Sequence, residues 1–73
     1  MGEPNKQVKL AILQGLVARW ENTRYETEVM LRVAKRIGDE TMQQQSVEML
    51  ARCEKALDEL AQEAAVLEES EHD

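Results

Sequence analysis

The chain has 73 residues with one cysteine and one histidine, so we expect one small domain and exclude both an internal disulfide and a Cys/His metal cage. Nine basic and fifteen acidic side chains give a net charge of −6, which provides no overall attraction to nucleic acid or to an anionic membrane. The first residues lack the apolar core of a signal peptide and no apolar run could span a bilayer, so we expect a cytoplasmic protein.

The first predicted element is a helix over about residues 4–37. Pro4 is compatible with a first helical turn, and Glu3 or Asn5 could cap it. From there to Ile37 no further proline occurs, and apolar residues recur every three or four positions along two adjacent lines, as in a coiled-coil seam. A stripe made of two such lines is too wide for one partner helix to cover.

A turn is predicted at Gly38 and Asp39. Gly38 suits the left-handed conformation that closes a helix, and Asp39 suits the N-cap of a following helix. Lys35 and Arg36 precede the glycine, where cations interact favourably with the carbonyl end of a helix. The alternative is one uninterrupted helix of roughly 65 residues, in which Gly38 would cost only about 1 kcal/mol.

The second helix is expected over about residues 40–69, and an acidic tail over residues 70–73, which carries the only histidine, should fray. Folding back at the turn pairs positions whose numbers sum to about 77, which brings Arg24 close to Glu54. Residues 1–38 are net positive and residues 39–73 net negative, so a basic helix would lie against an acidic one. The sequence therefore predicts an all-α fold, an antiparallel hairpin of two long helices forming a single domain over residues 1–73.

Two helices cannot bury two stripes of this width, so we expect a homodimer in which a second copy completes a four-helix bundle with two-fold symmetry. Cys53 lies on the apolar line of the second helix and is interpreted as a small buried residue with an inert thiol. An inter-subunit disulfide or a redox sensor is the alternative. The residues expected in the dimer or bundle core are Leu10, Leu13, Leu16, Val17, Trp20, Leu31, Leu50, Cys53, Leu57 and Leu60.

No catalytic constellation is predicted. His72 lies in the acidic tail, Cys53 has no histidine partner, and the carboxylates of the second helix are typical of a solvated face. Neither an inward-facing Glu-x-x-His pair nor a glycine-rich phosphate loop occurs. We therefore expect no enzymatic activity, no metal and no cofactor.

The middle of the first helix places polar residues on the stripe that should face the core, namely Thr23, Arg24 and Thr27. One interpretation is a structural polar layer, in which an Arg24–Glu54 ion pair sets the register of the two helices. The other is a small polar binding niche between the helices. Both interpretations stay open at this point.

The leading functional hypothesis is a small non-enzymatic protein that acts through protein–protein interaction, in an adaptor, chaperone-like or regulatory role. An apolar line on the outer face of the first helix, edged by arginines, is the predicted contact surface for the partner. It consists of Tyr25, Val29, Arg32, Val33 and Arg36.

The alternative is a nucleic-acid-binding regulator that uses the basic face of the first helix. Its footprint would be Arg19, Arg32, Lys35 and Arg36, with Tyr25 available for stacking on a base. These charges are few and glutamates interrupt them, whereas phosphate affinity grows with the number of phosphates neutralised. Protein interaction is therefore favoured, and no membrane partner is expected.

Overall fold

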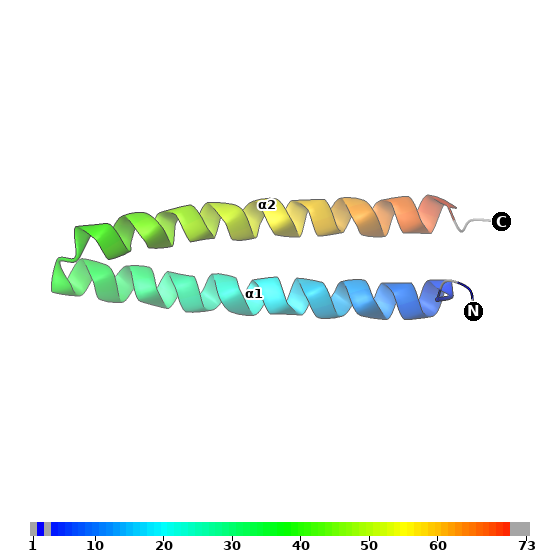
Figure 1. Cartoon of the computed structure of the whole chain (residues 1–73), viewed down its shortest axis with the longest axis horizontal. Coiled ribbons are helices and arrows are strands. Elements are labelled where there is room, and N and C mark those ends of the chain that lie inside the picture. Colours follow the sequence, from blue (N-terminus) through cyan, green and yellow to red (C-terminus); the bar gives the residue numbers. More distant parts are fainter. Residues whose placement is uncertain (1, 3, 71–73) are drawn as a thin grey trace.

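The computed structural model describes residues 2 and 4–70 and contains two α-helices in an antiparallel hairpin (Figure 1). Helix α1 spans Lys6–Ile37 and helix α2 spans Glu40–Ser70. The helices lie side by side, and the start of α1 and the end of α2 lie at the same end of the molecule, opposite the turn (Figure 1). The predicted all-α hairpin is therefore confirmed, and the predicted tail residues 71–73, His72 among them, lie outside the described residues.

The first helix begins with Asn5 as its N-cap. The Asn5 side-chain oxygen accepts a hydrogen bond from the Val8 N–H at 2.9 Å, which satisfies one of the unpaired donors of the first turn. Pro4 thus precedes the cap and does not lie in the first turn, so α1 starts two residues later than the approximate boundary of the prediction. Of the two candidate caps, Asn5 has the short side chain that reaches these donors, and a glutamate is a poorer cap.

The turn takes the predicted form at Gly38 and Asp39. Gly38 has φ 73° and ψ 28°, and its N–H and that of Asp39 donate to the carbonyls of Lys35 and Ala34 in the last turn of α1. The Asp39 side chain then accepts from the Met42 N–H at 2.9 Å, which caps α2. Two residues therefore end one helix and begin the next, which fixes the register of the hairpin.

The helices meet along a line of small side chains, which we call the seam. Its fully or almost fully buried members are Thr27 and Ala34 on α1 and Ser46 and Cys53 on α2. Each pair is seven residues apart, about two helical turns, and so lies on one line of its helix. The Thr27 hydroxyl donates to the Thr23 carbonyl at 2.7 Å, so its burial leaves no unpaired polar group.

The large apolar side chains flank the seam and are not enclosed by it. Of the residues expected in a dimer or bundle core, only Cys53 is buried in the single hairpin. The others are half-buried: Leu10, Leu13, Leu16, Val17, Trp20, Leu31, Leu50, Leu57 and Leu60. One helix covers only a narrow strip of its neighbour, so wide apolar stripes keep their outer margins in contact with water.

The outline of the molecule is a rod of 55 × 17 × 17 Å. Its radius of gyration is 16.6 Å, whereas a compact domain of this length has about 11 Å. Within the described residues neither helix has the apolar stretch that a membrane crossing requires.

Candidate interaction site

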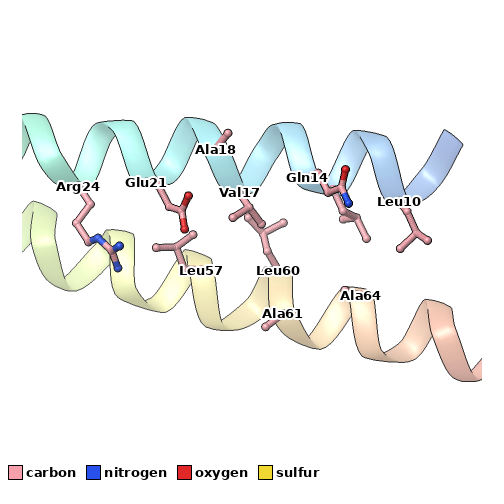
Figure 2. A pocket seen from close by; sticks show the side chains of 11 residues that line it. Leu10, Gln14, Val17, Ala18, Glu21, Arg24, Leu57, Leu60, Ala61 and Ala64 are labelled. Carbon is pink, nitrogen blue, oxygen red and sulfur yellow. The ribbon is translucent and has the colours of Figure 1, made fainter. Parts of the chain in front are cut away.

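One side of the hairpin carries an apolar hollow of about 500 Å³ between the two helices, which we call the leucine groove. Figure 2 shows Val17, Leu57 and Leu60 pointing into the space between α1 and α2, with Glu21 and Arg24 at the end nearer the turn. The full lining is Leu10, Leu13, Gln14, Val17, Ala18, Glu21, Arg24, Leu57, Leu60, Ala61 and Ala64. Half of the residues expected in the bundle core therefore line an open groove of the single chain.

The opposite side of the seam carries three further hollows. The one nearest the free ends is lined by Ile12 and Val66, and the central one by Trp20 and Met49 between Arg19 and Arg52. The third, near the turn, is lined by Met30, Met42 and Met49 among polar residues. Apolar surface therefore lies open on both sides of the seam.

The polar layer predicted in the middle of the hairpin forms across the two helices. The Arg24 guanidinium donates to the Glu54 carboxylate at 3.1 Å, and more than a third of each side chain is exposed. Both residues border an open polar hollow that also contains Glu21, Tyr25 and Glu28. The ion pair is the contact that the structural interpretation predicts. The polar hollow beside it is the feature that the binding-niche interpretation predicts.

The predicted outer contact surface is only partly exposed. Tyr25 exposes 63% of its surface, and Arg32 and Arg36 are exposed, whereas Val29 and Val33 are half-buried. Side chains three and four positions apart on a helix cover one another, so a valine between long neighbours loses accessible surface even on an outer face. Tyr25 and the two arginines would thus make most of any contact there.

The basic residues do not gather into one footprint. Arg32, Lys35 and Arg36 are exposed in the last two turns of α1, whereas Arg19 borders the central hollow beside Trp20. At 1.5 Å per residue, Arg19 lies about 20 Å along the helix from Arg32. A phosphate backbone following the end of α1 would therefore meet three cations, too few for strong electrostatic binding.

A set of large apolar side chains stays exposed on α1, and the sequence analysis did not single these residues out as a contact surface. Val8, Ile12, Met30 and Ile37 expose between 44% and 63% of their surfaces. The signal was present as three- and four-residue steps along the flank of the apolar stripe, but nothing in the sequence distinguishes a flank that faces α2 from one that faces water.

Cys53 is completely buried in the seam and carries a free thiol. Over the part of the chain that the structure describes, no three His, Cys, Asp or Glu side chains gather into a group that could hold a metal ion. Comparison of the chain with protein-family models, with curated proteins and with solved structures found no match.

Proposed function

We propose that this chain is a small non-enzymatic interaction protein, which dimerises through one side of the hairpin and binds a partner protein through the other. The observation that supports it is the apolar surface left open on both sides of the seam, with nine large core candidates only half-buried. A second copy laid on one side would complete a four-helix bundle and leave the other side free.

The exposed area is consistent with self-association. The hairpin exposes 5770 Å², whereas a compact monomer of this mass exposes about 4,600 Å². The surplus of roughly 1,200 Å² exceeds the approximately 800 Å² that each partner contributes to a standard interface. Sedimentation equilibrium of the full chain should give about twice the 8.4 kDa chain mass, and a well-folded monomer at micromolar concentration would refute self-association.

The leucine groove fits an amphipathic helix as its occupant. Two helices lying side by side leave a furrow into which a third helix can place apolar side chains at three- and four-residue spacing. The exposed carboxylates of Glu21, Glu54 and Asp58 lie on the helices that form it, so the helix that binds should carry basic residues at the margins of its apolar face.

A designed leucine–lysine helical peptide is a suitable probe, with a leucine–glutamate peptide as its counterpart. The lysine peptide should bind, and Ala61→Glu should abolish binding because Ala61 is exposed and lines the groove. Ala11→Glu is the matched control, since Ala11 is also exposed and lies outside the groove. Equal binding of the lysine peptide by the two variants would refute the assignment of the groove as its binding site. In a separate test, a gel shift of RNA or DNA by the protein at low salt would favour the nucleic-acid alternative.

A further inference from the structure

Four exposed apolar residues of α1, Val8, Ile12, Met30 and Ile37, belong to a regular line, which we call the α1 stripe: positions 8, 12, 15 and 19, then 26, 30, 33 and 37. On a helix these eight positions fall within roughly 60° of one another. Ile12, Arg19 and Met30 each line one of the hollows on the side opposite the leucine groove, and none of the eight positions lines that groove. The stripe therefore follows the side of the hairpin that the proposed partner leaves free.

The α1 stripe is symmetric about its own middle. Its steps are four, three and four residues on each side, and the midpoint falls between Asn22 and Thr23. Antiparallel pairing of two such helices about this midpoint brings together positions whose numbers sum to 45. Spacing by threes and fours is also the pattern with which two helices pack as a left-handed coiled coil.

The outer pairs of this arrangement are apolar. Val8 would face Ile37 of a second copy, and Ile12 would face its Val33. In the single hairpin Val8, Ile12 and Ile37 expose 46%, 51% and 63% of their surfaces, so contact between copies would remove from water apolar area that the fold itself leaves exposed.

The inner pairs are complementary in size and in charge. Gly15, beside which an added Cβ would meet nothing within 4 Å, would face the long flexible side chain of Met30. Arg19 would face Glu26, and the symmetry makes this pair twice. Neither Arg19 nor Glu26 forms an ion pair within the described hairpin, and about 10 Å along the helix separates them, so each is available to a second copy.

We propose that a second copy of this chain packs its α1 antiparallel along the α1 stripe, with a two-fold axis between Asn22 and Thr23. The inference rests on the proposed self-association and assigns its surface and direction. Two other directions fit less well. Parallel pairing of the two α1 helices sets Arg19 against Arg19 and Glu26 against Glu26.

Packing of α1 on the α2 of the second copy is the remaining direction. The register of the hairpin, in which Arg24 bonds to Glu54, would then place Met30 opposite Glu48 and Gly15 opposite Glu63. In that arrangement Arg19 and Glu26 would still face residues of opposite charge. Met30 and Gly15, however, would each face a carboxylate. Antiparallel pairing of α1 with α1 gives each of the four residues, Gly15, Arg19, Glu26 and Met30, a neighbour that matches it in size or charge.

A charge exchange within one chain separates these directions. Arg19→Glu and Glu26→Arg should each raise the dimer dissociation constant at least about tenfold, because each places like charges together twice. The double variant Arg19→Glu with Glu26→Arg should return it to within about threefold of the original value. If α1 packs on α2 of the second copy, the double variant will be weaker than either single one, which would overturn the proposal.

Lys55→Glu is the control with a matched charge change, because Lys55 is exposed on α2 and lies outside the stripe and outside the hollows described above, and it should leave the constant unchanged. Far-UV circular dichroism checks that each variant keeps its helices. If the original chain is a folded monomer, the proposed self-association fails and this inference with it. If the chain is a dimer that the double variant does not restore, only the α1 assignment fails.

A cross-link provides an independent measurement. In a Cys53→Ala background, Asn22→Cys should form a disulfide-linked dimer under mild oxidation, because the two copies of residue 22 lie next to the two-fold axis. Gln44→Cys, on an exposed position of α2, should remain monomeric in denaturing electrophoresis. Equal cross-linking at both positions would contradict the proposed axis.

Discussion

Replacing Gly38 by alanine should destabilise the hairpin by about 1 kcal/mol, because an L-residue pays about 1–2 kcal/mol to adopt the left-handed conformation. Gly38 holds φ 73°, and an added Cβ would meet no atom within 4 Å, so the cost comes from the backbone alone. The other helix-associated glycine offers a matched control. Gly15 lies inside α1, and within the hairpin an added Cβ there would meet no atom within 4 Å. The flexible Met30 side chain proposed to face it from a second copy can move aside for one methyl group, so Gly15→Ala should stabilise by up to about 1 kcal/mol because alanine is the better helix former.

Urea denaturation followed by far-UV circular dichroism, with every variant at one protein concentration, measures both changes. In a thermal melt of a chain of this size, a change of about 1 kcal/mol in the free energy of unfolding shifts Tm by about 4–8 °C. The Tm values of the two variants should therefore shift in opposite directions by readily measured amounts. The alternative of one uninterrupted helix makes the opposite prediction for Gly38, since alanine would then stabilise at both positions. A stabilising Gly38→Ala change would therefore refute the turn and with it the hairpin.

Contacts at the helix caps, in the seam and across the polar layer lead to three more predictions. Asn5→Ala and Asp39→Ala should each lower the free energy of unfolding by about 1 kcal/mol, because each removes a helix cap. Thermal melts in which Asp39→Asn loses as much stability as Asp39→Ala would contradict the capping role. Cys53 should react with iodoacetamide only as fast as the hairpin opens, so labelling as rapid in the folded chain as in urea would disprove its burial. A double-mutant cycle on Arg24 and Glu54 should give a coupling energy below about 1 kcal/mol that decreases with salt, because both side chains are more than a third exposed. A larger coupling energy that does not depend on salt would contradict a screened surface pair.

Local signals made the turn predictable. Gly38 and Asp39 act through φ and through a side chain that reaches three residues ahead, so neighbouring residues alone determine the outcome. The turn then sets the register, which is why the contact between Arg24 and Glu54 across the hairpin could be predicted from residue positions alone. At the N-terminus two candidate caps stood two residues apart, and only the hydrogen bond of Asn5 identifies the one used.

Burial was less predictable, because it depends on which of two adjacent helical lines faces the other helix. Hydrophobicity points to leucines, yet the most buried line carries Thr27 and Ser46, whose side chains are small enough to fit between two adjacent helices. The leucines flank that line, and their final burial depends on what packs against the hairpin. The exposed residues Val8 and Ile12 illustrate the same limit, since periodicity gives a face of the helix but does not identify the molecule that covers it.

The two-residue connection between the helices also bears on the order in which the hairpin forms. Contacts beside the turn join residues close in sequence, whereas the Lys6–Glu68 ion pair, at 3.1 Å, closes a loop spanning nearly the whole chain. The entropic cost of closing a flexible loop rises by about 0.6 kcal/mol for each doubling of its length. Folding should therefore start at the turn around Gly38, next to the small buried residues, and contacts between the helices should then form one after another toward the free ends. Folding φ-values should decrease along α1 from Ala34 toward Lys6, and uniform values would indicate that the helices dock as preformed rods.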